Sequence, residues 1–190
     1  MSPQPQIIPR DDPRYPARLR RRLGAHAPPE LTALGNLDIL SQPMTALFCS
    51  ARCPGKLILR TYDQAAQWRD AGHCVVSGFH SPVEKECLSI LLRDEPPIII
   101  CPARGLPKRI PPDWEKPLAD GRLLILSIFS QTESRITADL AARRNELVAA
   151  LADQVFVAYA TPGGRLESSL HRLEPKATRA RPPVKSTSSP

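Results

Sequence analysis

The sequence lacks the signals of a secreted, membrane-spanning or disulfide-stabilised protein. Its longest apolar runs, such as 123–128, are far shorter than the roughly 20 residues that a membrane-spanning helix needs. The N-terminal residues 1–9 do not combine a basic region with an apolar one, so they do not resemble a secretory signal. We therefore expect a soluble cytoplasmic protein without membrane contact.

The five cysteines lack the spacing of a metal site. No C-x-x-C pair is present, and three of the cysteines lie inside apolar runs typical of strands. A zinc site built from Cys49, Cys53 and a histidine would lack the paired spacing of structural zinc ligands. We expect buried free thiols, no metal and no other cofactor, as in a reducing compartment.

Acidic residues are outnumbered by basic ones. The chain has 26 Lys and Arg against 19 Asp and Glu, which gives a formal net charge of +7 at pH 7. Such a surface concentrates polyanions, so phosphate-rich or acidic partners are favoured. Catalysis has little support, because His73 and His80 have no recognisable Ser or Cys partner and no paired acids are present. We do not expect an enzyme.

The length of 190 residues leaves room for one ordinary domain with short tails. We expect a flexible N-terminus over 1–11, an N-terminal arm packed on the domain over 12–44, the domain itself over 45–173, and a disordered basic tail over 174–190. The tail is rich in Pro, Ser, Thr and basic residues and has no apolar periodicity, so it buries too little surface to fold.

Short apolar runs alternate with helical stretches within the domain. The runs predict strands at 45–49, 74–77, 98–101, 123–127 and 155–160. Helices are expected at 56–71, 83–92, 135–152 as the longest, and 166–173, whereas the Pro-rich stretch 102–117 predicts loop with short turns. Because the runs are apolar throughout, both faces of the sheet should be covered. The fold class is α/β, a Rossmann-like, mostly parallel sheet flanked by helices.

Loops at the carboxyl edge of such a sheet are where ligands bind. In the first, Ser50 and Arg52 precede a helix, whose backbone N–H groups could hold a phosphate; the alternative is an arginine that only covers surface. In the second, Ser77 and Gly78 end a strand, and Phe79 or His80 could stack on a base; the alternative is that Phe79 covers the core edge and His80 is an ordinary turn residue.

A third loop at this edge has two glycines, Gly163 and Gly164, followed by Arg165. The glycines leave backbone amides free to line a phosphate site, although such turns are common. Arg144, on the predicted longest helix, adds charge near the same edge if it does not simply lie on a solvated helix face.

Several segments resemble the DprA/Smf DNA-processing family, in a Rossmann-like group that also holds the LOG phosphoribohydrolases. Residues 144–153 (RNELVAALAD) are similar to the family helix R-N-R-I-I-A-G-L-S-D, and 164–169 are similar to its turn G-[ST]-L-x-T-A. Residues 50–52 take the place of its G-[ST]-R loop, and 75–78 match its V-V-S-G strand end. The lead-in from Tyr15 to Asn36 is similar as well.

The chain also departs from the family pattern. After Gly78 the family continues A-x-G-I-D-x-x-A-H, whereas this chain has FHSPVE at 79–84. Glu146 replaces an arginine, and Tyr159 stands where a glutamate is typical. Leu170 fills the place of the catalytic glutamate of the LOG motif, which argues against LOG-type hydrolysis.

The resemblance implies binding of single-stranded DNA, loading of RecA recombinase and a homodimer, in DNA uptake or recombination. The phosphate-facing residues would then be Ser50, Arg52, Ser77, Gly78, Arg144, Asn145, Gly163, Gly164 and Arg165. One alternative on the same fold is a nucleotide-ligand sensor or nucleotide-processing domain, and another is a scaffold whose groove binds nothing.

Overall fold

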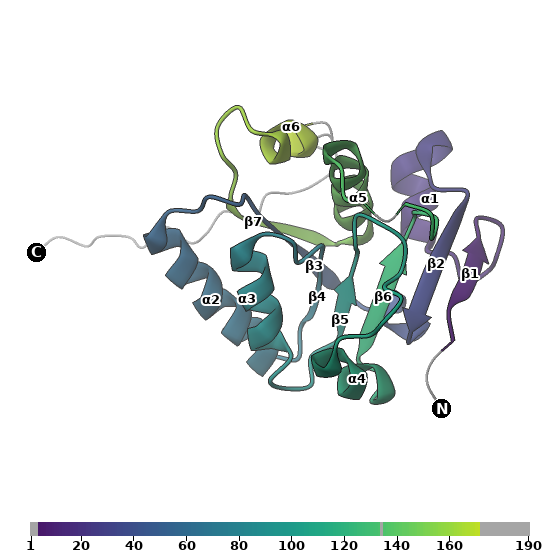
Figure 1. The fold of residues 1–190 in the computed structure, drawn as a ribbon, viewed down its shortest axis with the longest axis horizontal. Helices are drawn as coiled ribbons and strands as arrows, with labels where there is room; N and C mark the ends of the chain where they lie inside the picture. The colour runs from purple at the N-terminus through teal and green to yellow at the C-terminus, as the bar shows by residue number, and fades with distance from the viewer. Residues whose placement is uncertain (1–3, 134, 172–190) are drawn as a thin grey trace, which may run out of the picture.

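A seven-stranded sheet forms the centre of the molecule in the computed structural model, which describes residues 4–133 and 135–171 (Figure 1). The strand order is β1-β2-β6-β5-β4-β3-β7. The last five strands in sequence pair in parallel. Their bounds are β3 (Met44–Cys49), β4 (Cys74–Ser77), β5 (Ile98–Ile100), β6 (Leu123–Ser127) and β7 (Gln154–Tyr159). Each predicted apolar run therefore forms a strand, with ends that differ by a residue or so.

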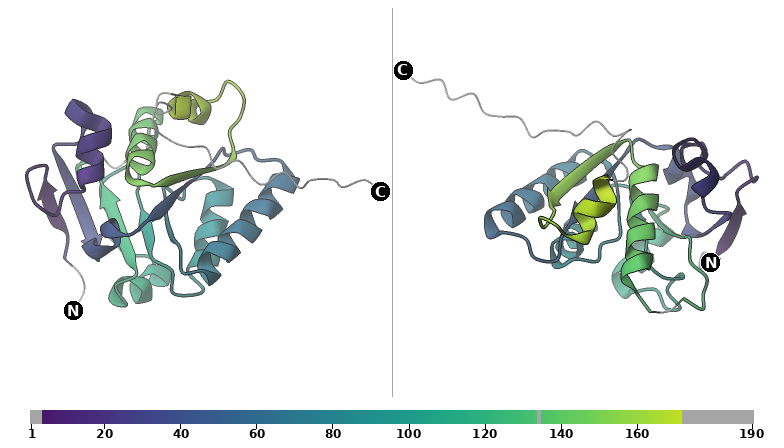
Figure 2. Two further views of the ribbon diagram at one scale, coloured as in Figure 1. Left: turned by 180° about the vertical axis from the view of Figure 1, so that it is seen from behind. Right: turned by 90° about the horizontal axis from the view of Figure 1, so that it is seen from above.

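Helices cover both faces of this sheet, which confirms the α/β, Rossmann-like prediction (Figure 2). They are α1 (Ala17–Leu23), α2 (Gly55–Asp70), α3 (Pro82–Leu91), α4 (Pro112–Ala119), α5 (Ala138–Leu151) and α6 (Arg165–His171). Side chains of α2, α3 and α4 share one buried cluster with the sheet, and those of α1 and α5 share the other. Adjacent residues Val75 and Val76 belong to opposite clusters, because successive strand side chains point to opposite faces.

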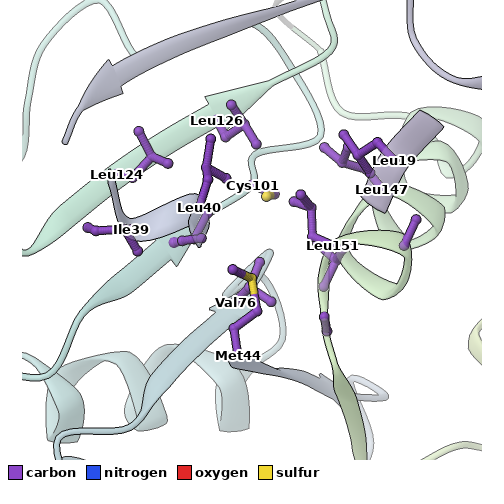
Figure 3. Close-up of a cluster of buried hydrophobic side chains, with 14 of the residues drawn as sticks. Leu19, Ile39, Leu40, Met44, Val76, Cys101, Leu124, Leu126, Leu147 and Leu151 are labelled. Carbon is purple, nitrogen blue, oxygen red and sulfur yellow. The ribbon is translucent and has the colours of Figure 1, made fainter. Parts of the chain in front are cut away.

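The cluster under α1 and α5 shows how the second face is closed (Figure 3). Leu19 of α1 and Leu147 and Leu151 of α5 converge on Val76, Leu124 and Leu126 of the sheet, with Ile39 and Leu40 from a short 3-10 helix (Leu37–Ser41). Cys101 lies among them as a small apolar side chain. This packing fixes α5 against this face of the sheet, with Arg144 near the carboxyl end of β5 and Leu151 near the start of β3.

The N-terminal region is part of the sheet, and this corrects two expectations. Strand β1 (Gln6–Pro9) pairs antiparallel with β2 (Glu30–Gly35), which pairs antiparallel with β6. Ile8 is fully buried, so the prediction of a flexible segment over 1–11 is wrong for β1. The region 12–44 is likewise more than an arm packed on the domain, because β2 lies between β1 and β6 within the sheet.

Arginines attach α1 to the end of α5. Arg18 donates to the Leu151 carbonyl oxygen at 2.7 Å and pairs with the Asp153 carboxylate at 2.9 Å. Arg22 donates to the carbonyl oxygens of Ala150 and Ala152. The last carbonyls of a helix lack intrahelical donors and carry partial negative charge, so guanidinium groups stabilise them. These arginines therefore belong to the fold rather than to a ligand site.

Two helix predictions need correction. The stretch 102–117, expected to be loop with short turns, contains the start of the eight-residue helix α4. This helix begins at Pro112, where the missing N–H of a proline costs nothing. The longest helix is α2, with 16 residues, rather than α5, with 14. The tail predicted over 174–190 lies outside the described residues. Within those residues, no helix is long and apolar enough to cross a membrane.

Candidate functional site

The sheet changes its winding direction at β3. From β3 the chain adds β4, β5 and β6 in one direction along the sheet, and then returns through α5 to place β7 on the other side of β3. The loops that leave the carboxyl ends of β3 and β7 therefore diverge to opposite faces. In open α/β sheets the crevice at such a switch point is where ligands bind, so the β3 and β7 loops are the first place to look for a site.

Ser50 joins these two loops. Its backbone N–H donates to the Tyr159 carbonyl oxygen at 2.8 Å, and its hydroxyl oxygen accepts the Thr161 N–H at 3.0 Å. The loops predicted at 50–55 and 161–165 are thus brought side by side. The Ser50 hydroxyl already has a protein partner, which gives this side chain a positioning role beside the crevice.

Unpaired positive groups gather where the β3 loop enters α2. No side chain caps this helix, whose N-cap is Pro54, and its first turn contains no acidic residue. Among the described residues, the backbone N–H groups of Arg52, Gly55 and Lys56 have no hydrogen-bond acceptor. The Arg52 and Lys56 side chains are exposed and have no ion-pair partner in the same part of the chain. Free amides, a helix start and two cations all favour an anion here.

A cavity of about 530 Å³ lies beside this helix start. Its walls come from the β3 loop, α2, the start of α3 and the end of β7. The lining residues are Ala51, Arg52, Cys53, Pro54, Ile58, Tyr62, Pro82, Val83 and Tyr159. Arg52 is the charged member of this set, and the rest is apolar or aromatic. The cavity is therefore built like a small-ligand site, with mostly apolar walls and a few polar groups.

The second predicted loop is occupied by the protein's own side chains. Ser77 is fully buried; its hydroxyl donates to the Leu47 carbonyl oxygen at 2.8 Å and accepts the Phe79 N–H at 3.2 Å. Phe79 is 6% exposed and belongs to the core. The expectation that Ser77 faces a phosphate is wrong, because no surface of it reaches solvent.

Arg144 is also buried, and it supports Gly78 from inside. Its Nη1 donates to the Cys101 carbonyl oxygen at 3.2 Å, and its Nε donates to the Asn145 side-chain oxygen at 2.8 Å. A Cβ atom at Gly78 would lie 1.2 Å from this Nη1. Burial lowers the pKa of Arg144, while the nearby Glu84 carboxylate opposes that effect. Arg144 therefore joins α5 to the β4 and β5 loops, and the expectation that it faces a phosphate is wrong. Asn145 is half-buried on α5, and its phosphate contact stays a prediction.

A buried carboxylate takes the place that an anion would fill at the start of α3. Glu84 is 5% exposed, and its Oε1 accepts the Cys49 N–H at 2.9 Å. Its Oε2 accepts the N–H groups of His80 at 2.8 Å and Ser81 at 3.0 Å, while the Ser81 hydroxyl accepts the Glu84 N–H. This capping box satisfies the first turn of α3 and ties it to the end of β3.

The third predicted loop is partly closed in the same way. The Gly163 N–H donates to the Glu167 carboxylate at 2.7 Å, and the Gly164 N–H donates to the Thr161 carbonyl oxygen at 2.8 Å. Arg165 is exposed at the first position of α6. The two glycines therefore shape the turn with amides that are already bonded, and Arg165 contributes charge at this edge.

Nucleophile or metal chemistry finds no support at these loops. Burial and the neighbouring Cys53 raise the pKa of the Cys49 thiol, which keeps it protonated. All five cysteines are free, and four are buried, as expected from the sequence. No three His, Cys, Asp or Glu side chains are grouped to hold a metal ion anywhere in 4–133 or 135–171.

Comparison with protein families identifies the family of this chain. Residues 6–169 match the family described as "DNA recombination-mediator protein A". The chain belongs to this family. A comparison with curated proteins gives no significant match.

Solved structures of two family members share the fold. DNA processing protein A (DprA) from Streptococcus pneumoniae superposes with a TM-score of 0.72 at 22% identity, covering 88% of this chain and 59% of that protein. DNA processing protein A from Helicobacter pylori gives 0.68 at 22% identity, covering 90% and 75%. The H. pylori protein is described as having a unique single-stranded DNA binding mode. The chain thus spans little more than half the length of the S. pneumoniae protein.

Some of the family motifs of this DprA family member lie inside the protein, and only part of them reaches the surface of the candidate site. The R-N pair of α5 and the S-G end of β4 meet inside the protein, whereas Arg52 of the G-[ST]-R place reaches the surface. The sequence analysis did not predict that Lys56 lies at the site, that Tyr62 lines the cavity, or that Glu84 caps the start of α3. The spacing S-x-x-E at 81–84 would have indicated the cap.

Proposed function

We propose that this DprA family member binds single-stranded DNA at the crevice between β3 and β7. The observation that carries the proposal is the open start of α2 with Arg52 and Lys56, beside a cavity at the switch point of the sheet. Phosphate groups of a strand would accept hydrogen bonds from the free amides and from the Arg52 guanidinium, which matches phosphate geometry. Arg165 and Ser50 belong to the same edge.

Support for a nucleic acid as the anion comes from charge and family. The net charge of +7 favours a polyanion, and the H. pylori relative is described as binding single-stranded DNA. A role in binding rather than catalysis accords with the protonated Cys49 thiol. We place the protein in the cytoplasm, where free cysteines persist.

Two finer statements belong to the same proposal. The family description as a recombination mediator supports a role in loading RecA recombinase onto the bound strand. The resemblance to the family also supports a homodimer, whose mass light scattering of the purified protein would measure. A monomer that binds oligo-dT would overturn the dimer and leave DNA binding standing.

Fluorescence anisotropy with labelled oligo-dT at low salt tests the DNA proposal. Replacing Arg52→Ala and Lys56→Ala together should weaken binding about tenfold or more, because hydrogen bonds to charged groups contribute about 1.5–3 kcal/mol each. The matched control is Arg93→Ala with Lys116→Ala, which removes the same charge at the opposite edge of the sheet. Equal weakening by both double variants would show that net charge alone attracts the strand, and would overturn the proposed site.

A further inference from the structure

We infer that the cavity between α1 and the short 3-10 helix after β2 is a second phosphate site, which holds the backbone of the strand bound at the α2 start. This inference rests on the proposed function, because it adds a second contact for the same strand. The cavity has a volume of about 750 Å³. Its walls come from the start of β1, the loop before α1, α1 itself and residues 35–41, so it is separate from the crevice between β3 and β7.

The excess of basic residues is concentrated beside this cavity. Residues 10–22 contain six arginines and two aspartates, whereas residues 23–171 contain 15 basic and 16 acidic residues. The rest of the described chain is therefore close to neutral, and the potential that attracts a polyanion should be strongest around α1. Long-range attraction of a strand is thus directed to α1 as well as to the α2 start.

Most of the six arginines in 10–22 have no carboxylate partner. Arg14 and Arg18 pair with aspartates at 2.7 Å and 2.9 Å. The other four have no ion-pair partner within 4–133 or 135–171. Of these four, Arg20 and Arg21 line the cavity. Two cations are therefore available there for an anion.

Arg20 is held in one orientation, with a nitrogen left for a ligand. Its Cζ lies 5.4 Å from the centre of the Tyr15 ring, and its Nη2 donates to the carbonyl oxygens of Asp12 at 2.8 Å and Tyr15 at 3.4 Å. Its Nε is buried without an acceptor among the described residues, whereas its Nη1 retains contact with solvent. A guanidinium that is already fixed loses little freedom when it binds a phosphate.

The lining of the cavity favours phosphate groups over bases. Tyr15 is the one aromatic residue among the lining, and it is 2% exposed with its ring beneath Arg20, so no ring is open for stacking. The exposed side chains of Arg21 and Ser41 have no partner in the described part of the chain, and both can donate to phosphate oxygens. Asp38 is the acidic residue of the lining, and its exposed carboxylate is outnumbered by the arginines.

The order of the helices joins the two sites along one face of the sheet. Helix α5 packs against α1 on one side and α6 on the other (Figure 2). Helix α6 follows the β7 loop, which Ser50 joins to the β3 loop beside the first site. Neighbouring helices lie about 8–10 Å apart, so α1 is roughly 20 Å from α6 across α5. A strand of about ten nucleotides covers this span, at about 3.4 Å per nucleotide.

Fluorescence anisotropy with two lengths of labelled oligo-dT tests the second site. A strand of about five nucleotides fits one site, whereas a strand of about 30 can reach both. Arg21→Glu should weaken binding of the long strand about tenfold or more and leave the short strand within about twofold, because only the long strand spans both contacts. The matched control is Arg93→Glu, which reverses an exposed charge beyond the end of α3, on the other face of the sheet.

Each outcome separates this inference from the proposed function. Arg52→Ala with Lys56→Ala should weaken both lengths, because both bind at the α2 start. No effect of Arg21→Glu on the long strand, or an equal effect of Arg93→Glu, overturns the second site and leaves the first standing. Equal weakening of both lengths by Arg21→Glu would mean that short strands bind at α1, and overturns its role as a second contact. No binding of either length by the wild-type protein overturns the proposed function together with the inference.

Salt dependence gives a second measurement that does not reverse a charge. Arg21→Ala removes a side chain that has no hydrogen-bond or ion-pair partner among the described residues, so the fold should be unaffected. The log–log slope of long-strand affinity against salt should become shallower by about 0.7, the value for one phosphate of a single strand, while the short-strand slope stays unchanged. Unchanged slopes for both lengths would contradict the inference.

Discussion

Glu84 offers the sharpest test of how the site loops are built. Its carboxylate accepts three backbone N–H groups, from Cys49, His80 and Ser81, at 2.8–3.0 Å, and it is 5% exposed. Glu84→Ala would leave these donors without an acceptor in a buried place, at about 1–3 kcal/mol each. Such costs are not strictly additive, so we expect a loss of about 3–6 kcal/mol in the free energy of unfolding, a large part of a typical domain's total.

Urea unfolding at neutral pH measures this loss. Glu84→Gln should lose less, about 2 kcal/mol, since the amide keeps one acceptor oxygen but turns its NH₂ toward a donor. Glu86→Ala on the exposed side of the same helix is the matched control, and we expect a change within about 0.5 kcal/mol. Acetate should stabilise Glu84→Ala more than the wild-type protein, because it can refill the donors.

A loss for Glu84→Ala no larger than that for Glu86→Ala would refute this reasoning. It would mean that the β3 and β4 loops do not depend on the internal carboxylate. The assignment of the α3 start as a closed site, in contrast to the open α2 start, would then have no energetic basis.

Three further predictions concern other parts of the fold. Gly78→Ala should lower the free energy of unfolding, measured in urea, by about 3 kcal/mol, because the new Cβ would displace the Arg144 guanidinium. A Cβ at Gly55 would have nothing within 4 Å, so Gly55→Ala should change this free energy by less than about 1 kcal/mol. Equal effects would contradict the close approach. Burial lowers the pKa of His73 below 6.5, so the unfolded chain binds a proton at this histidine more readily than the folded protein does. The free energy of unfolding should therefore fall as the pH drops below 6.5, and His73→Gln should make this pH dependence weaker. An unchanged pH slope would show that His73 does not contribute. Arg22→Ala should cost about 1–3 kcal/mol by leaving the carbonyl oxygens of Ala150 and Ala152 without this donor, and a neutral result would show that Arg22 does not help to hold α1 against α5.

The parallel part of the sheet was predictable because its signal is local. Runs such as Leu123–Ser127 are almost wholly apolar and are buried on both faces. Gly72, which follows the end of α2, and Pro82, which begins α3, are residues typical of helix boundaries. Strand β1 was missed because only Ile8 of its four residues is buried, so its pairing with β2 depends on tertiary contacts that no local pattern contains.

The candidate site was predictable only for residues whose place between a strand and the next helix puts them at the carboxyl edge of the sheet. Arg52 follows a buried strand and precedes a helix, and that is enough to place it at the carboxyl edge. A motif does not say whether its residues face solvent, and Ser77 and Arg144 proved to be buried. The neighbourhood of Tyr62 and Tyr159 depends on β7 lying beside β3, which follows from the sheet order and not from the sequence pattern.

The most direct test of DNA binding at the α2 start is the salt dependence of oligo-dT affinity. Each phosphate neutralised contributes a log–log slope of about −0.7 for single strands. The slope for Arg52→Ala with Lys56→Ala should therefore be shallower than that of the wild-type protein by about 1.4, while Arg93→Ala with Lys116→Ala should keep the wild-type slope. Parallel slopes for wild type and the Arg52 and Lys56 double variant would contradict the account.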